Sequence, residues 1–227
     1  MDFSRMLGYT EALSKNNDRT WFHDNHRQYE QAQEDFLMVL DVMKFVLAKD
    51  APQIGDELLF ENPKNFMYRI PRDMRYSKNK TPYNPAFRAY LSPHKKDFLP
   101  LSYYIHISHE RCILETGAWP WETKQLNRLR EYIAYNYEEL DAICAENGLM
   151  VYGEQLKRTP RGYDTDHPAA DWLRYKFWLT EYSFAPDDLR DLDVFAEAAG
   201  AAVRRFEPFR QFLMGAFDDR IYEDDEE

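Results

Sequence analysis

Apolar residues change their spacing along this chain, and the change limits the fold more than any other sequence feature. Across residues 21–48 they recur three, four or seven positions apart, which predicts a long amphipathic helix. Within residues 86–119 the runs AFRAYLSP, LSYYIHIS and RCILETGAW are short, aromatic and β-branched, which predicts a meander of antiparallel strands. Helical spacing returns over residues 122–147. Strands in the middle of the chain, flanked by helices on both sides, indicate an α+β fold with a central antiparallel sheet.

The remaining segments complete this expected arrangement. They are a helix over 3–14, a break at KNNDRT where Asn17 or Asp18 can cap the next helix, a strand over 149–156, a helix starting near Pro168, a strand over 177–184, and a helix over 186–217 that Gly200 or Pro208 could interrupt. No internal repeat or long flexible linker divides the chain, so residues 1–227 are expected to form a single domain. The acidic end from about residue 218 is expected to be frayed.

Composition excludes several classes of protein. Hydrophobic residues make up 44% of the chain and aromatic residues 16%, which favours a folded globule over disorder. No secretory signal is evident, and no apolar stretch approaches the length of a membrane span, so no membrane association is expected. The two cysteines, Cys112 and Cys144, predict reduced thiols in a cytoplasm rather than a disulfide framework. A net charge of −11 disfavours binding to nucleic acid over most of the surface.

Residues 68–88 are strongly basic although the protein is acidic, with six Lys and Arg against one Asp. Pro71 disfavours an ordinary helix through this stretch. Polyproline II and 3₁₀ backbones both repeat every three residues, so either would align on one side the cations Arg69, Arg72, Arg75 and Lys78. Aligned cations repel one another unless an anion lies between them, and the planar guanidinium group can bind phosphate or carboxylate through two hydrogen bonds.

The basic stretch therefore predicts a site for a small ligand that carries phosphate or carboxylate. The residues expected to contact the anion are Arg69, Arg72, Arg75, Lys80 and Tyr83. Asp73 could orient a neighbouring guanidinium or act as a base. If a reaction occurs, the candidate titrating groups are Asp73 and His167, and a histidine suits proton transfer near neutral pH because its unperturbed pKa is about 6.5.

Two other interpretations of the basic stretch stay open. The arginines could form internal salt bridges with the many carboxylates of the chain. One salt bridge at the surface stabilises the folded state by only about 0–1 kcal/mol. The stretch could instead belong to a non-catalytic module that docks an acidic protein or a segment of RNA. In that case Tyr68, Tyr76 and Tyr83 would stack on bases of single-stranded RNA.

A second polar concentration, LKRTPRGYDTDHP, lies at residues 156–168. It supplies three cations and a titratable group that we include among the candidate site residues: Lys157, Arg158, Arg161 and His167. If this segment folds against residues 69–83, the two would form one pocket with cationic walls. Alternatively, Asp164 and Asp166 only neutralise these cations, while Asp166 or His167 caps the next helix.

Other catalytic and metal-binding signatures are absent from the sequence. His23 and His26, like His106 and His109, are three residues apart, but neither pair matches a known zinc-binding pattern, so no metal site is expected. The sequence contains no phosphate-binding Walker loop, no dinucleotide glycine fingerprint and no Gly-x-Ser-x-Gly elbow. It therefore indicates no cofactor and no particular reaction.

The basic stretch also resembles the signature of a bacterial family known as domain of unknown function 2461. That signature is Arg-x-x-Arg-Asp-x-Arg-Phe, followed by Asp or Asn, Lys, two further residues and Tyr. The chain matches it from Arg69 to Tyr83, except that Tyr76 stands where the family usually has Phe. The segments NNDRTWFHDNHRQYE, YYIHIS, ETGAW and LKRTPRGYDTDHP are similar to the family as well. The resemblance implies a single bacterial domain and no established activity.

Overall fold

Helices at both ends of the chain flank a four-stranded antiparallel sheet, which confirms the predicted α+β fold. The computed structural model describes residues 1–75, 78–94, 97, 99–120 and 122–218. The expected frayed tail therefore lies almost wholly outside the described residues. The helices are α1 (Phe3–Lys15), α2 (Arg19–Asp24), α3 (His26–Asp50), α4 (Pro52–Leu58), α5 (Thr123–Glu146), α6 (Ala170–Leu173) and α7 (Leu192–Gly215), with short 3₁₀ turns at Pro63–Phe66 and Pro186–Leu189.

The described chain clusters into two compact units. Unit 1 consists of Met1–Lys96, Tyr103–Leu114 and Tyr182–Val203; unit 2 consists of Asp97–Ser102, Glu115–Glu181 and the chain from Arg204. The single-domain organisation stays a prediction. Within the described residues, no helix is both long enough and apolar enough to cross a membrane.

Asn25 divides the helix predicted over residues 21–48 into α2 and α3, so the predicted continuity is wrong at this point. The Asn25 backbone has φ −107° and ψ 18°, and its side-chain Nδ2 donates to the Trp21 carbonyl at 2.9 Å. An asparagine side chain can replace main-chain partners in this way, which periodicity alone does not reveal. The preceding cap was predicted correctly, because Asp18 accepts a hydrogen bond from the Trp21 N–H at 2.9 Å.

The final helix, in contrast, is continuous at the two positions where an interruption was considered. Pro186–Leu189 forms a separate 3₁₀ turn, and α7 then continues through both Gly200 and Pro208 without a break. Its apolar stripe is buried through Phe195, Ala199, Val203, Phe206, Phe209 and Leu213. Burial of such a stripe outweighs the low helix propensity of one glycine and one proline.

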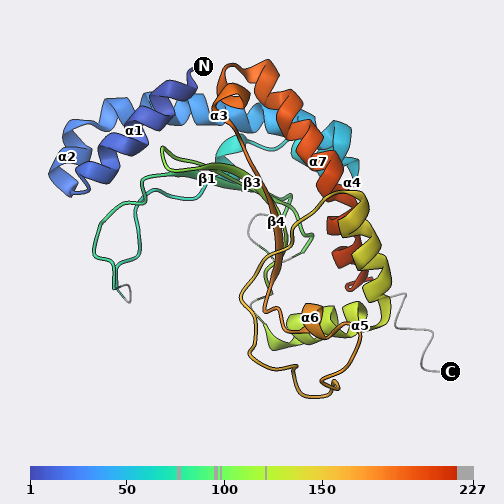
Figure 1. Ribbon diagram of the computed structural model, residues 1–227. Helices are drawn as coiled ribbons and strands as arrows, with labels where there is room; N and C mark the ends of the chain where they lie inside the picture. The colour runs from blue at the N-terminus through green and yellow to red at the C-terminus, as the bar shows by residue number, and fades with distance from the viewer. Residues whose placement is uncertain (76–77, 95–96, 98, 121, 219–227) are drawn as a thin grey trace. The chain divides into compact units, whose positions relative to one another are not determined.

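The sheet has the strand order β1-β2-β3-β4, with β1 at Phe87–Leu91, β2 at Tyr103–Ile107, β3 at Cys112–Ala118 and β4 at Trp178–Ser183. In unit 1, β1 and β2 pair with Arg88 opposite His106. Alternate residues of these strands are buried on the face that α3 covers, where Phe36 and Phe87 have ring centroids 5.5 Å apart (Figure 1). Arg88 and His106 therefore point to the opposite face of the sheet.

Unit 2 has its own apolar core. The fully buried members include Leu101, Ala118, Leu129, Ile133, Leu173, Trp178, Phe209 and Phe212. Helix α5 supplies one wall of this core and is kinked at Asn136, where φ is −117° and ψ is 23°. The segment predicted as a strand over residues 149–156 is attached instead by two isolated antiparallel bridges, Tyr152 to Leu179 and Gln155 to Tyr175.

Candidate functional site

The basic stretch forms an antiparallel arm that continues from β1. Three main-chain hydrogen bonds join its two halves: Tyr68 N to Arg88 O at 2.8 Å, Asn84 N to Ile70 O at 2.8 Å, and Arg72 N to Pro82 O at 2.9 Å. Pro71 and Tyr83 form an isolated bridge between them. The arm, which we define as residues 67–89, appears in Figure 1 as the teal ribbon that extends from β1.

Burial alternates residue by residue along the first half of the arm. Arg69, Asp73 and Arg75 are exposed, whereas Ile70 is buried and Arg72 is half-buried. This is the two-residue period of an extended strand, so Arg72 lies on the opposite face from Arg69 and Arg75. The predicted three-residue alignment of these cations is therefore wrong, because pairing with residues 82–88 fixes an extended backbone. Tyr76, the position that departs from the family signature, lies outside the described residues.

Asp73 and Arg75 form a bidentate ion pair on the exposed face of the arm. The Arg75 Nη2 lies 2.6 Å from Asp73 Oδ2, and the Arg75 Nε lies 3.0 Å from Asp73 Oδ1. Hydrogen bonds from the Arg75 side chain lower the pKa of the Asp73 carboxyl group, and the same pair raises the pKa of Arg75. Asp73 therefore orients a neighbouring guanidinium, one of the two roles considered for it.

The other cations of the arm have no carboxylate partner among the described residues. Arg72 Nη1 is 3.3 Å from the Thr81 hydroxyl, and Lys80 Nζ donates to the Met74 carbonyl at 3.0 Å. Arg69 is exposed. Only part of the basic stretch is thus neutralised by internal acids.

Arg88 is a half-buried cation of the arm, and it was not among the predicted site residues. Its guanidinium lies over the Tyr68 ring, 5.4 Å from the centroid. When the Asn84 side-chain amide is oriented with its oxygen toward Arg88, this oxygen accepts hydrogen bonds from both terminal nitrogens of the guanidinium group at 3.2 Å. Among the described residues, the buried Arg88 Nε has no hydrogen-bond partner. A half-buried guanidinium group without a neighbouring carboxylate lacks both an acceptor for its Nε and a compensating negative charge.

His106 lies beside Arg88 on the same face of the sheet. Its Nδ1 is 3.3 Å from the Tyr104 hydroxyl, and its Nε2 is 3.1 Å from the Ser108 hydroxyl. Burial, followed by the charges of Arg111 and Arg88, lowers the pKa of His106 to about 4. His106 is therefore neutral at physiological pH, and the positive charge of this face comes from the arginines.

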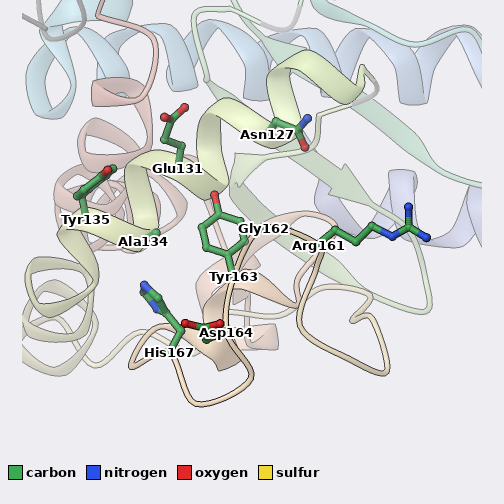
Figure 2. Close-up of a pocket in the computed structure, with 9 residues that line it drawn as sticks. All are labelled: Asn127, Glu131, Ala134, Tyr135, Arg161, Gly162, Tyr163, Asp164 and His167. Atoms are coloured by element: carbon green, nitrogen blue, oxygen red, sulfur yellow. The ribbon is translucent and has the colours of Figure 1, made fainter.

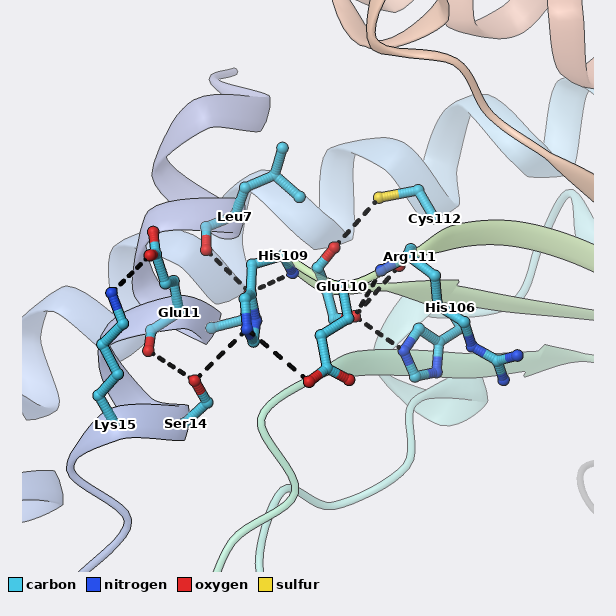
Figure 3. Close-up of polar contacts among 11 residues, drawn as sticks. Leu7, Glu11, Ser14, Lys15, His106, His109, Glu110, Arg111 and Cys112 are labelled. Atoms are coloured by element: carbon cyan, nitrogen blue, oxygen red, sulfur yellow. Dashed lines mark hydrogen bonds and ion pairs between the residues drawn. The ribbon is translucent and has the colours of Figure 1, made fainter.

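The turn that follows His106 is fastened to helix α1. The His109 N–H donates to the Thr10 hydroxyl at 2.9 Å, and the His109 Nε2 lies 3.4 Å from the Ser14 hydroxyl (Figure 3). Ser108 closes the turn by accepting from the Arg111 N–H at 3.2 Å. These contacts set the positions of Ser108 and Arg111, and through them the environment of His106.

Tyr83 is held at the base of the arm by helix α2 and the residues before it. Its ring stacks on Phe22 with centroids 4.2 Å apart, and its main chain is hydrogen-bonded to the Asn17 side chain. Contact between Tyr83 and a ligand stays a prediction.

The second polar segment lines a pocket of about 580 Å³ in unit 2 (Figure 2). The pocket lies between one face of α5 and the segment, and its lining residues are Asn127, Glu131, Ala134, Tyr135, Arg161, Gly162, Tyr163, Asp164 and His167. Lys157 and Arg158 are exposed and are not among these lining residues. The structure thus brings Arg161 and His167 together with acids and tyrosines. The expected single pocket shared with residues 69–83 stays a prediction, since those residues belong to unit 1.

His167 has a defined tautomer in this pocket. Its Nδ1 accepts a hydrogen bond from the Ala169 N–H at 3.0 Å, so in the neutral ring the proton sits on Nε2. Helix α6 has Ala169 as its N-cap residue, so neither Asp166 nor His167 caps it, contrary to the alternative interpretation of this segment. Among the described residues, no group of three or more His, Cys, Asp or Glu is arranged to hold a metal ion.

Comparison with known protein families places this chain in a family. The model of the family described as "Conserved hypothetical protein (DUF2461)" matches residues 5–212. The chain belongs to this family. No curated protein and no solved structure matches it.

Membership of DUF2461 covers both the arm and the pocket, but the family description assigns no activity to either. Sequence reasoning omitted Arg88 from the site because it lies thirteen residues beyond Arg75, inside a predicted strand. It also omitted Asn127, Glu131 and Tyr135. Their four-residue spacing places them on one helix face, but only the tertiary structure places that face against residues 161–167.

Proposed function

We propose that the protein binds a small ligand bearing phosphate or carboxylate on the outer face of β1 and β2 in unit 1. We call this surface the Arg88 face and define it by Tyr68, Arg72, Arg88, Tyr104 and His106. The observation that carries the proposal is the environment of Arg88. This residue is half-buried, and the part of the chain that the structure describes offers neither a partner for its Nε nor a carboxylate beside it. An anion at this face would supply the missing negative charge.

The neighbours of Arg88 support this proposal. Arg72 lies on the same side of the arm by strand alternation, and its terminal nitrogen has a neutral hydroxyl partner at 3.3 Å rather than an acid. Tyr104 and His106 offer an uncharged hydroxyl and imidazole next to the cations. Arg75 and Lys80 lie farther out along the arm, and Arg69 lies on its opposite side, so their charges would attract an anion over a longer range. The proposal concerns binding and assigns no reaction to Asp73 or His167.

The test is a thermal-shift and calorimetric titration with pyrophosphate and citrate. Selective binding to the folded state stabilises it by about 2.7 kcal/mol when the ligand is present at about 100 times its dissociation constant. Arg88→Gln and Arg72→Ala should each reduce this stabilisation. Arg27→Ala is the matched control, because it removes an exposed arginine of unit 1 that lies outside the arm. Equal ligand responses in all three variants would rule out the Arg88 face.

The two alternatives give different results in the same titration. A module for RNA would bind single-stranded oligonucleotides more tightly than pyrophosphate, with a strong dependence on salt. A purely structural arginine network would bind neither, and Arg88→Gln would then lower only the melting temperature. The ion pair between Asp73 and Arg75 is the feature of the arm that agrees with this structural alternative.

A further inference from the structure

The outer face of β3 and β4 in unit 2 carries an exposed tryptophan, stacked on a half-buried phenylalanine, beside two carboxylates. Trp119 and Phe177 stack in parallel, with ring centroids 4.3 Å apart and an interplanar angle of 4°. Trp119 is 55% exposed, which is unusual for so large an apolar side chain. Next to this stack, Gly117 approaches the neighbouring strand so closely that a Cβ atom there would lie 2.9 Å from the Leu179 Cα.

The carboxylates lie at the other end of the same face. The Tyr152 hydroxyl donates to Glu115, and it lies 3.2 Å from Glu181 Oε2. Trp119 directly follows β3 and Phe177 directly precedes β4. By continued alternation, Glu115 and Trp119 fall on one side of their segment, as do Phe177 and Glu181 of theirs. We define the β3–β4 face by these five residues: Glu115, Trp119, Tyr152, Phe177 and Glu181.

Three oxygen atoms meet at this point but have one hydroxyl proton between them. The Tyr152 proton can be given fully to only one of these two carboxylates at a time. Glu181 is exposed and has no ion pair with any described residue. Glu115 and Glu181 are brought close together on neighbouring strands, so a positive charge beside Glu181 would stabilise this face.

We propose that the β3–β4 face docks an extended basic segment of a partner protein. An arginine of that segment would lie against Glu181, and a second planar side chain would stack on the exposed ring of Trp119. Trp119 lies four positions after Glu115, which corresponds to roughly 13 Å in an extended chain. Two arginines four positions apart in an extended peptide have the same separation. The argument for this occupant is complementary charge: two carboxylates with an adjacent aromatic platform suit guanidinium groups.

The probe is a fluorescein-labelled peptide with two arginines four positions apart in a Gly/Ser background. Its binding is measured by fluorescence anisotropy at 150 mM salt. Glu181→Gln should weaken binding about tenfold or more, as expected for the loss of a charge-assisted hydrogen bond. Trp119→Ala should also weaken it. A second peptide with adjacent arginines should bind less tightly than the first, because it cannot span the two ends of the face.

The matched control is Glu139→Gln, which removes one negative charge from an exposed position on α5 in the same unit. It should leave the affinity unchanged. Equal weakening by Glu139→Gln and Glu181→Gln would show general attraction to an acidic protein and overturn the proposal. Agmatine binding as tightly as the peptide would overturn it as well, because a single small cation would then account for the site. Glu181→Lys keeps a long side chain at this exposed position, and it should abolish binding.

Discussion

The side-chain amide of Asn17 holds the main chain of Tyr83 in both directions. Its Nδ2 donates to the Tyr83 carbonyl at 3.0 Å, and its Oδ1 accepts from the Tyr83 N–H at 3.0 Å. The two residues are 66 positions apart, so this pair fastens the arm to the connection between α1 and α2. Stacking of Tyr83 on Phe22 strengthens the same junction. The arm is thus positioned by a small number of identifiable contacts.

Asn17→Ala should loosen the arm. The variant removes two hydrogen bonds, each worth about 1 kcal/mol net, and leaves the Tyr83 amide and carbonyl dependent on water. Hydrogen exchange should accelerate for amides such as Arg72 and Asn84, while α3 stays protected. Asn16→Ala is the control, because the Asn16 side chain bonds only to Ala12 within its own helix. Unchanged exchange in the arm of Asn17→Ala would contradict this account of how the arm is held.

Gly117→Ala should destabilise the protein by more than about 3 kcal/mol. Gly117 has a φ of +140°, and an added Cβ would lie 2.0 Å from the Trp178 carbonyl oxygen, which belongs to main chain that cannot easily move away. Gly8→Ala is an informative comparison, since an added Cβ at this helical position meets nothing within 4 Å. It should stabilise by about 0.5–1 kcal/mol through helix propensity. Urea unfolding of both variants measures the two effects.

Arg210→Met should destabilise unit 2 by about 3–5 kcal/mol. Arg210 is 2% exposed, forms a bidentate ion pair with Glu207 and donates to the Leu101 carbonyl at 2.9 Å. Its removal leaves a buried carboxylate without its counter-charge. The double variant Arg210→Met with Glu207→Leu should recover much of this loss, because two apolar side chains need no charge compensation. A double variant as unstable as the single one would indicate that packing, rather than charge, dominates at this position.

The stability of the protein should fall between pH 6.5 and pH 4 in part through His106. Its pKa in the folded protein is about 4, whereas an unfolded histidine titrates near 6.5. In this interval the unfolded chain binds the proton and the folded protein does not, so acid favours unfolding; above pH 6.5 the contribution of His106 is constant. The difference amounts to at most about 3 kcal/mol, and partial solvent exposure reduces it.

Chemical denaturation across this pH range measures the contribution of His106. His106→Gln retains groups that can hydrogen-bond to Tyr104 and Ser108 but does not titrate, so its stability should depend less on pH than that of the unmodified protein. His23→Gln serves as the control, because the side chain of His23 is 90% exposed. Identical pH dependence in the unmodified protein and His106→Gln would show that other groups account for the acid sensitivity.

The order and type of the main elements could be predicted from the sequence, because they depend on local periodicity. Helical spacing predicted α5, short aromatic and β-branched runs predicted β1, β2 and β3, and alternation predicted β4, each within a few residues. Predictions failed where a distant or unusual contact competes with periodicity. The Asn25 side chain breaks a helix that the apolar spacing continues, and core burial carries α7 through Pro208.

The sequence by itself determined that cations are concentrated in residues 68–88 and that a second polar cluster follows at 156–168, because both are properties of local composition. Only the tertiary structure decided how those groups are distributed. Strand pairing turns Arg72 away from Arg69, Asp73 takes Arg75 as its partner, and Arg88 is enclosed by Tyr68 and Asn84. The physical reason is that charge is carried by each residue type alone, whereas burial, partner and direction depend on residues that are brought close only by folding.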